Sequence, residues 1–313
     1  MDAHFVWHTP AGQPPQLLLQ CLAPCIPYLT AQQWLSLLNQ GLIRVNGAVC
    51  TDNVLVNGGS RIDYTVPDYS EGEVDTLWQC LWYNTEIAAI HKPANLPVNR
   101  TTRNVYNTLI QLLRRESPWP DAHLLHRLDT ETSGIILIGQ NHAAALRHQA
   151  HLDKLIKRKI YHAIVHGNPA WSDMPCECDL NTQAGSAIRA QMYVLPAGQG
   201  KHSRSHFRVL KQLKGFALLE CEIFTGRKHQ IRAQLASLGH PIVGDKIYAH
   251  GGEFYLKRLQ QPLAAEDFDQ LISEHHLLHA YSLHLHNQWQ TGGADIVIND
   301  PHYPPAWQAL LNH

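Results

Sequence analysis

HRLDTETSGIILIGQ, residues 126–140, is the stretch on which the fold of this chain depends. Its second half, 135–138, is a short apolar run between Gly134 and Gly139, which is typical of a buried strand. Asp129 comes just before that run, so it lies where a loop meets a rigid element. Chemistry is often found at such a place, and so is a capping Asp. The stretch by itself leaves both interpretations open.

Length and composition bound the class of protein. A chain of 313 residues can form one large domain and a small one, and a hydrophobic fraction of 44% is enough for a core. No apolar run of about eighteen residues indicates a membrane span, and the N-terminus shows no secretory pattern. The seven cysteines follow no framework or CxxC spacing. We therefore expect reduced thiols and a cytoplasmic protein.

Charge is distributed unevenly along the chain, although the formal net charge is only −1. Residues 1–90 hold 2 Lys/Arg and 8 Asp/Glu, residues 91–250 hold 21 and 11, and residues 251–313 hold 2 and 7. A basic centre between acidic ends is compatible with binding of a polyanion. It is equally compatible with a solvated basic face.

A polar, acidic stretch at residues 67–76, PDYSEGEVDT, is interpreted as a linker. It divides the chain into a small N-terminal domain, residues 1–76, and a large domain, residues 77–313. Within the small domain a helix is expected to end at Gly41. The pair Asn46-Gly47 then predicts a hairpin with a type I′ turn.

Strands and helices alternate in the large domain. A helix is expected at 107–116 with Asn107 as its cap, and another at 141–159, whose last turn would place Lys and Arg at the negative end of its dipole. A strand with Tyr161 follows. The expected elements after it are three antiparallel strands, at 186–195, 206–213 and 216–224. The last predicted helix lies within 225–241, closed by Gly239, with Lys228 and Arg232 on one face.

Three motifs together resemble the RluA-type family of RNA pseudouridine synthases. The family signature HRLDxxTSG is matched by residues 126–134, the element KxYxAxVxG by 159–167, and GRxHQIRxxLxxxGHPIxGDxxY by 226–248. The segment 277–285, LLHAYSLHL, is similar to the family's Leu-His-Ala strand. The resemblance spans about residues 83–313 in order. It implies an α+β pseudouridine synthase fold with a mixed, mainly antiparallel sheet.

Residues 15–66 resemble, more weakly, the alpha-L RNA-binding fold of small-subunit ribosomal protein S-four. Such a module often precedes this catalytic domain. Here it carries more acidic than basic residues, so it lacks the basic surface with which phosphates are usually bound. It is therefore either a weakened RNA binder or a contact for a protein.

The resemblance implies a reaction and a site. The bond from the ribose to the ring nitrogen of uridine breaks, the base rotates, and it rejoins through carbon five; no metal or other cofactor is implied. The family's catalytic aspartate falls on Asp129, its basic partner on Arg232 and its base-stacking tyrosine on Tyr161. Arg127 matches an arginine thought to fill the gap left by the flipped nucleotide. Further substrate contacts are assigned to His126, Thr132, Arg227, His229 and Gln230.

Each of these residues has a simpler interpretation. Asp129 alone could cap a turn, Arg232 could be a surface cation, Tyr161 could be core, and Arg127 could be structural. The complete nonapeptide HRLDTETSG favours the catalytic interpretation of Asp129. Thr132 is better suited to hold the loop by hydrogen bonds than to act as a nucleophile.

The chain departs from the family pattern in two places. Asn95 replaces the glycine of Lys-Pro-x-Gly; Asn tolerates a positive φ better than most residues, so we expect the turn to persist. Gln234 stands where the family commonly has a histidine, which puts one substrate contact in doubt.

An RNA pseudouridine synthase is thus the favoured hypothesis. A catalytically silent RNA-binding protein on the same scaffold is the alternative, and a glycoside hydrolase, which needs two carboxylates, is a third. We expect a monomer that acts on ribosomal RNA or, next, on transfer RNA, without DNA or membrane partners. The many histidines show no metal-ligand spacing, and no metal site is predicted.

Overall fold

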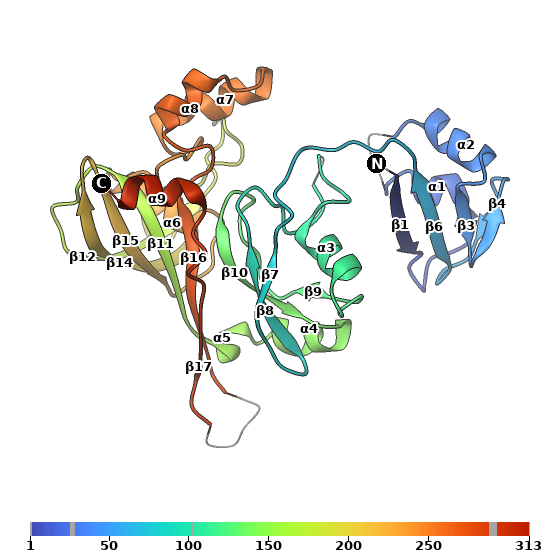
Figure 1. Ribbon diagram of the computed structural model, residues 1–313, viewed down its shortest axis with the longest axis horizontal. Coiled ribbons are helices and arrows are strands. Elements are labelled where there is room, and N and C mark those ends of the chain that lie inside the picture. Colours follow the sequence, from blue (N-terminus) through green and yellow to red (C-terminus); the bar gives the residue numbers. More distant parts are fainter. Residues whose placement is uncertain (1, 26–28, 102, 288–292, 313) are drawn as a thin grey trace. The chain divides into compact units, whose positions relative to one another are not determined.

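The computed structural model describes residues 2–25, 29–101, 103–287 and 293–312, and Figure 1 labels most of their elements. The chain forms two compact units. The first consists of Met1–Val74 with Asn99–Leu112, and the second of Asp75–Val98 with Leu113–His313. The predicted division of the chain has a single boundary, after residue 76. Residues 99–112 instead return to the first unit.

A small antiparallel sheet forms the first unit. Its strand order is β1 (Ala3–His8), β6 (Arg61–Val66), β3 (Ile43–Val45) and β4 (Ala48–Cys50). The remaining elements are β2 (Gln16–Leu17), which pairs with β5 (Leu55–Val56), and the helices α1 (Leu18–Leu22) and α2 (Ala31–Asn39). Trp34 of α2 is buried in the same core as Ile43 and Ile62 of the sheet.

Local sequence signals set the ends of helix α2 and the turn of the hairpin after it. Helix α2 begins with a capping box, in which the Thr30 side chain and Gln33 satisfy each other's backbone N–H groups, and it is followed by Gly41 at φ +68°. Asn46 and Gly47, at φ +51° and +87°, join β3 to β4 with both central residues left-handed. The predicted type I′ hairpin is confirmed.

The segment 99–112 is tied to the end of residues 1–74 by one carboxylate. Glu71 accepts hydrogen bonds from the backbone N–H groups of Val105, Tyr106 and Asn107 at 2.8, 3.1 and 2.5 Å. Part of the predicted linker is thus structured. A carboxylate that binds three consecutive backbone N–H groups more than thirty residues away has no sequence signature, so the return of this segment to the first unit is not predictable from the sequence.

A large sheet forms the second unit. Its strands, in spatial order, are β13 (Tyr193–Leu195), β12 (Asp173–Asn181), β14 (Lys201–Leu213), β15 (Phe216–Ile223), β11 (Ile156–His166), β16 (Leu278–Leu285), β10 (Ser133–Gly139), β8 (Ile87–Lys92) and β7 (Gln79–Tyr83). In addition, β17 (Ile296–Asn299) pairs with β16, and β9 (His123–Leu124) pairs with β10. Every pairing is antiparallel except that of β10 with β16. The predicted α+β fold with a mixed, mainly antiparallel sheet is confirmed.

Helices accompany this sheet. They are α4 (His142–Gln149), α5 (Leu152–Leu155), α6 (Gln230–Ser237), the 3₁₀ turn η1 (His250–Gly252), α7 (Glu253–Gln260), α8 (Ala265–Leu271) and α9 (Pro305–Leu311). Helix α3 (Leu109–Glu116) begins in the first unit, which includes Leu109–Leu112, and ends in the second. Helix α3 begins at Leu109, whose preceding residue Thr108 accepts the Leu112 N–H, so Asn107 lies one position too early for the predicted cap. No helix in the described part of the chain is long and apolar enough to cross a membrane.

Gly134 of the opening stretch permits the one parallel pairing. Its φ is +105°, and a Cβ atom there would come within 2.4–2.8 Å of the Ala280 backbone on β16. A side chain at this position would therefore separate the two central strands. The sheet therefore requires the glycine in HRLDTETSG. The position of β10 in the sheet in turn fixes the point at which the strand and the preceding loop with Asp129 meet.

The helix predicted at 141–159 is wrong in its second half. The chain leaves α5 at Leu155 and enters β11, which lies between β15 and β16. Hydrogen bonding to two neighbouring strands overrides local helix propensity. Lys157 and Arg158 project from a strand and pair with Asp295 and Glu222, so the proposed interaction with a helix dipole does not exist.

Two smaller expectations are also corrected. Helix α6 starts at Gln230, after His229 in a left-handed conformation, so Lys228 precedes the helix and shares no face with Arg232. Of the strand predicted at 186–195, only Tyr193–Leu195 is a strand. The strands predicted at 206–213 and 216–224 correspond to β14 and β15.

Candidate active site

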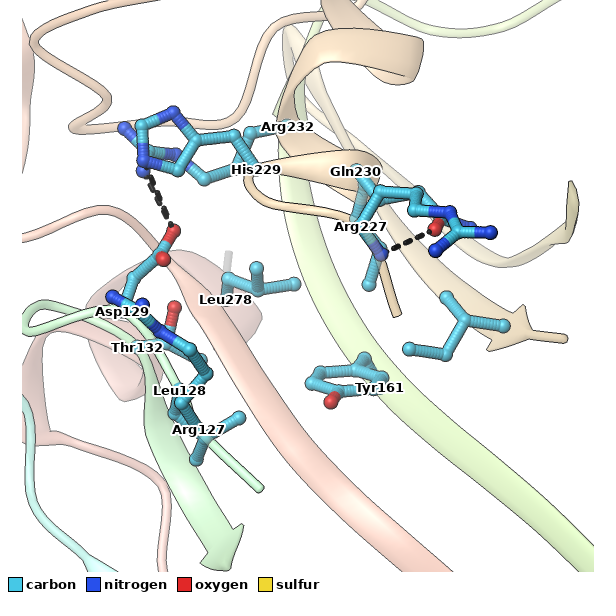
Figure 2. Close-up of a pocket in the computed structure, with 12 residues that line it drawn as sticks. Arg127, Leu128, Asp129, Thr132, Tyr161, Arg227, His229, Gln230, Arg232 and Leu278 are labelled. Carbon is cyan, nitrogen blue, oxygen red and sulfur yellow. Dashed lines mark hydrogen bonds and ion pairs between the residues drawn. The ribbon is translucent and has the colours of Figure 1, made fainter. Parts of the chain in front are cut away.

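A pocket opens between the loop before β10, the strand β11 and the start of α6 (Figure 2). It is lined by Arg127, Leu128, Asp129, Thr132, Tyr161, Ile223, Arg227, His229, Gln230, Ile231, Arg232 and Leu278. Eight of the nine site residues proposed from the sequence belong to this lining. Among these lining residues Asp129 alone carries a carboxylate, and the apolar side chains supply a wall on which a flat base can lie.

Lys92 anchors the loop that carries Asp129. The Lys92 ammonium group, fully buried at the end of β8, donates to the carbonyl oxygens of Pro93, Leu96 and Thr130 at 2.7–2.9 Å. Burial lowers the pKa of Lys92 to about 7. Asn95 takes φ +57°, which confirms the expected left-handed turn.

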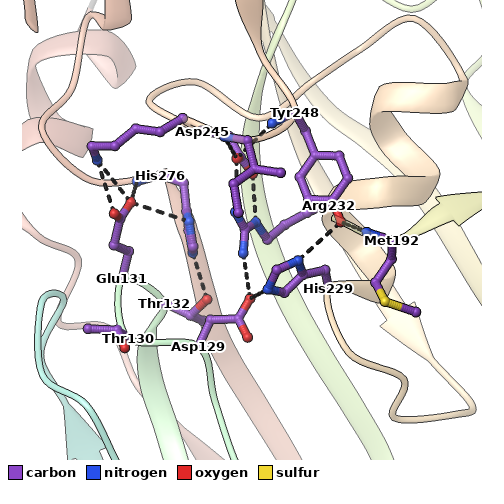
Figure 3. Close-up of polar contacts among 12 residues, drawn as sticks. Asp129, Thr130, Glu131, Thr132, Met192, His229, Arg232, Asp245, Tyr248 and His276 are labelled. Atoms are coloured by element: carbon purple, nitrogen blue, oxygen red, sulfur yellow. Dashed lines mark hydrogen bonds and ion pairs between the residues drawn. The ribbon is translucent and has the colours of Figure 1, made fainter. Parts of the chain in front are cut away.

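A second set of contacts anchors the residues after Asp129 (Figure 3). Glu131 binds the Lys246 ammonium at 3.0 Å, and burial notwithstanding, that charge holds the pKa of Glu131 at about 2. The Thr132 hydroxyl lies 2.7 Å from His276 Nε2, and the Ser133 hydroxyl lies 2.8 Å from His279 Nδ1. Backbone and side chains therefore fix the loop in one conformation.

Arg232 of α6 joins two carboxylates. Its Nη1 donates to Asp129 Oδ2 at 2.8 Å, while Nε and Nη2 donate to the two oxygens of Asp245 at 2.6 and 2.9 Å. Asp245 is fully buried and also accepts the N–H groups of Ile247 and Tyr248. Two parallel bonds to a planar guanidinium fix its orientation, so Asp245 determines where Arg232 meets Asp129.

The charge of Asp129 is maintained by this arrangement. Burial opposes its ionisation, but the Arg232 guanidinium together with His229 and His276 outweighs burial, so that the pKa of Asp129 lies below its ordinary value. Oδ2 is engaged by Arg232, whereas no hydrogen bond from the described residues reaches Oδ1. The result is an ionised carboxylate with one anchored oxygen and one oxygen available to the pocket.

Tyr161 lies on β11 with 8% of its surface exposed. The register of β16 shifts beside it, where Tyr161 faces Ala280 and Ile160 faces Ser282. Such a bulge re-aims nearby side chains. Burial, and secondarily the Asp129 charge, raise the pKa of Tyr161 well above its usual range, so the phenol is neutral.

His229 lies at the left-handed residue that precedes α6. Its Nε2 is 3.7 Å from Asp129 Oδ2, and its Nδ1 is 3.1 Å from the Tyr248 hydroxyl. Burial, assisted by the Arg232 charge, lowers the pKa of His229 to about 4, so the imidazole is neutral near pH 7.

The other lining residues differ in whether their side chains already have hydrogen-bond or ion-pair partners. Gln230 is saturated: its oxygen accepts from Thr225 and the Arg227 N–H, and its nitrogen donates to the Arg204 carbonyl and Ser205. It therefore shapes the loop. Arg127 and Arg227 are exposed, and neither has a carboxylate within 4.0 Å in the described residues. These two cations are available to an anion.

His126 does not line the pocket. Its Nε2 accepts the backbone N–H of Leu137 at 3.0 Å, and burial lowers its pKa to about 4. Gln234, which replaces a common family histidine, is fully buried and bonds Ser203 and Ser205 away from the pocket. Both residues thus support the structure around the site.

Sequence reasoning gave no role to Asp245, Tyr248, Lys92 or Glu131, although each lies inside a motif already recognised. It also did not anticipate a group outside the pocket: His91, Asp300 and His302 have ligand-type atoms within 4.8 Å of one another. His91 and Asp300 are 209 residues apart, so no spacing rule could have paired them. Hydrogen bonds of 2.6 and 2.9 Å from the two histidines to Asp300 account for this group.

The pocket thus places one carboxylate beside an arginine against an apolar wall. The family described as RNA pseudouridylate synthase matches residues 86–237. An uncharacterized RNA pseudouridine synthase of Synechocystis sp. is 32% identical over 262 residues, which are 82% of this chain and 86% of that protein. The ribosomal large subunit pseudouridine synthase D of Pseudomonas aeruginosa is 29% identical over 279 residues, which are 86% of this chain and 84% of that protein.

A solved structure gives the same fold. Human RNA pseudouridylate synthase domain containing 1 superposes with a TM-score of 0.55 at 22% identity, over 75% of this chain and 86% of that chain. The chain belongs to the RluA-type family of RNA pseudouridine synthases, and it is an isomerase that converts uridine in RNA to pseudouridine.

Proposed function

We propose that Asp129 is the carboxylate on which the isomerisation depends, acting on the ribose either as a nucleophile or as a stabilising anion. The observation that carries this proposal is its pair of unequal oxygens, one held by Arg232 and one open to the pocket. When the bond from ribose to ring nitrogen breaks, positive charge develops on the sugar carbon. A fixed anion beside that carbon stabilises the charge without reorganisation.

Arg232 and Tyr161 have distinct proposed roles. Arg232 keeps Asp129 ionised and oriented, and Asp245 keeps Arg232 in place. Tyr161 supplies a flat ring on which the detached uracil can lie while it rotates, and its hydroxyl assists removal of the proton from carbon five. The apolar Leu278 and Ile231 limit the space around the base.

The proposed substrate is structured RNA, with ribosomal RNA favoured and transfer RNA next. Exposed cations without a carboxylate partner in the described residues lie near the pocket: Arg127, Arg204, Arg227 and Lys228. By contrast, Arg158 and Arg208, farther along the sheet, are paired with Glu222 and Glu220. Unpaired cations around a pocket are free to bind phosphates. Pseudomonas aeruginosa and Nitrosomonas europaea relatives are named ribosomal large subunit pseudouridine synthase D.

The first unit is proposed as an accessory RNA-binding module of the alpha-L type. Its helix α2 followed by the β3–β4 hairpin supports this assignment. We further propose that the enzyme is a cytoplasmic monomer that needs no metal for catalysis, as the sequence analysis expects.

One substitution tests the proposed role of Asp129. Asp129→Asn removes the charge and keeps the shape, so the variant should fold and bind RNA but form no detectable pseudouridine. Pseudouridine mapping of ribosomal and transfer RNA, from cells with and without the gene, supplies the substrate for the assay. Turnover by the folded Asn variant at more than about one per cent of the wild-type rate would refute the role, since losing a central electrostatic group costs about 10² or more in rate.

A further inference from the structure

Tyr248 lies at the end of the turn that begins with Asp245. Its backbone N–H is held by Asp245 Oδ1 at 3.1 Å, and its ring lies against the Arg232 guanidinium, 5.2 Å from centroid to Cζ. The ring also meets the His229 imidazole edge to face, with centroids 5.7 Å apart (Figure 3). The position of the Tyr248 hydroxyl is therefore defined by contacts on three sides.

The direction of the hydrogen bonds at this hydroxyl follows from chemistry. The backbone N–H of Met192 lies 2.8 Å from the Tyr248 oxygen, and an amide nitrogen can only donate. The phenolic proton is then left for His229 Nδ1, at 3.1 Å, which is its only other partner among the described residues. The chain of bonds runs from Met192 N–H to Tyr248 and from Tyr248 O–H to His229.

This direction decides the tautomer of His229. If Nδ1 accepts, a neutral ring must carry its proton on Nε2, the atom 3.7 Å from Asp129 Oδ2. The ring is neutral near pH 7, because burial and the Arg232 charge lower its pKa to about 4. The left-handed backbone at His229, φ +54°, turns the ring into the pocket.

We infer that Tyr248 and His229 are positioning residues for Asp129: Tyr248 holds His229 as the Nε2–H tautomer, and that N–H is aimed at the carboxylate oxygen already bound by Arg232. The inference rests on the proposed role of Asp129. It deepens that role by placing a neutral N–H 3.7 Å from Oδ2, beyond hydrogen-bond distance, where it attracts that oxygen electrostatically and leaves Oδ1 to face the substrate.

A neutral donor suits this position better than a second cation. Arg232 already compensates the charge of Asp129, and an imidazolium in addition would weaken the carboxylate as an anion. The wrong tautomer would present the lone pair of Nε2 to Asp129 and repel it. Tyr248 prevents that by donating one ordinary hydrogen bond to Nδ1, which fixes the tautomer.

A double-mutant cycle tests the inference in the full-length protein. Tyr248→Phe removes the hydroxyl but keeps the ring against Arg232, and His229→Asn keeps a residue that tolerates the left-handed backbone while losing the reach to Asp129. Each single variant should lower kcat by about five- to tenfold with KM for RNA nearly unchanged, as for loss of one hydrogen bond made in the transition state. The double variant should be no slower than His229→Asn, because the two residues act in series.

The matched control is Tyr193→Phe, which removes a hydroxyl bonded to Ser186 and Gln191 in the neighbouring loop. It should leave kcat within about twofold of the wild type, since that hydroxyl does not touch the pocket. The inference would be overturned if the fold-decreases in kcat of the two single variants multiplied in the double variant. It would also be overturned if the variants changed KM but not kcat.

A direct readout does not depend on activity. In long-range ¹H–¹⁵N spectra, His229, assigned by comparison with His229→Asn, should show an unprotonated Nδ1 and a protonated Nε2, and Tyr248→Phe should mix the two tautomers. A protonated Nδ1 in the wild type would refute the inference whatever the kinetics show. If instead Asp129→Asn proved active, the proposed function would fail while the tautomer result stood.

Discussion

Asp129 illustrates how one side chain acquires a role that its type alone does not give. An aspartate at the start of a strand could cap the turn; indeed its carbonyl oxygen accepts the Thr132 N–H. The carboxylate does something else, because Arg232 engages only one of its oxygens. What distinguishes Asp129 from an aspartate that only caps a turn is thus its bond to a residue 103 positions away.

At the residue scale, Tyr161 provides a prediction that separates stacking from proton transfer. Tyr161→Phe keeps the ring and removes the hydroxyl, so RNA affinity should be preserved. If the hydroxyl assists proton removal, the rate should fall by about 10²–10⁴, as for loss of a general acid or base. Single-turnover assays and filter binding measure the two effects; Tyr161→Leu, which loses the ring as well, is the control. An unimpaired rate in Tyr161→Phe would leave only the stacking role.

At the scale of elements, the site depends on how α6 and the turn after it are joined. The Arg232 side chain projects from α6 and is bound by Asp245. The helix and the turn are therefore joined through the guanidinium. The loop before β10 is held by Lys92, by residues near the start of β16 and, through the ion pair of Glu131 with Lys246, by the same turn that begins at Asp245. The relative placement of Asp129 and Arg232 thus depends on the contacts that join the loop, the helix and the turn.

Asp245→Asn should be costly for both stability and activity. It leaves the buried Arg232 with one carboxylate instead of two, and breaking a buried ion pair costs about 3–5 kcal/mol. The free energy of unfolding, from urea titration, should fall by about that amount, and kcat should fall with it. The matched control is Glu222→Gln, which breaks the pair with the more exposed Arg158 and should cost less than about 1 kcal/mol. Equal losses in the two variants would contradict the role given to Asp245.

At the scale of the whole molecule, buried neutral histidines make the second unit sensitive to acid. Burial lowers the pKa to about 4 for five of them: His126, His162, His229, His276 and His279. In the unfolded chain a histidine has a pKa of about 6.5. Between that pH and about pH 4 each of these histidines is therefore protonated in the unfolded chain but neutral in the folded protein. Their stabilising contribution is complete above about pH 6.5 and is lost as the pH falls toward about 4.

The expected result is a free energy of unfolding that decreases between about pH 6.5 and pH 5, by up to about 1.4 kcal/mol per pH unit for each such histidine. Urea unfolding at several pH values in that range measures the slope. His126→Gln should reduce this slope by up to about 1.4 kcal/mol per pH unit, which is the contribution of one bound proton. Stability that did not change with pH over this interval would show that these histidines are not held neutral.

RNA binding provides a second prediction for the whole molecule. If the cations near the pocket neutralise phosphates, Arg227→Gln with Lys228→Gln should weaken binding and reduce the slope of log Kd against log salt by about 0.7–0.9 for each phosphate that is no longer neutralised. The control removes the same number of charges from the first unit, as Arg44→Gln with Arg61→Gln, and should leave the slope nearly unchanged. A larger reduction in the control would make the first unit the main electrostatic anchor.

The sequence by itself determined the parts of this protein that depend on local chemistry. The glycine-bounded apolar run gave β10, Asn46-Gly47 gave the hairpin, and Asn95 gave a left-handed turn, because each depends on the conformational limits of one or two residues. The motifs also named eight of the residues that line the pocket. Their roles in the reaction stay predictions; the structure shows that they meet in one pocket.

Only the tertiary structure decided the rest. It made residues 156–159 a strand against their helical pattern, since two neighbouring strands were available to pair with them. It placed Asp245 behind Arg232 and Tyr248 beside His229, and it removed His126 from the pocket. These outcomes depend on hydrogen bonds between distant segments, whose partners exist only after the chain has folded, and no local pattern encodes which partner a buried polar group will find.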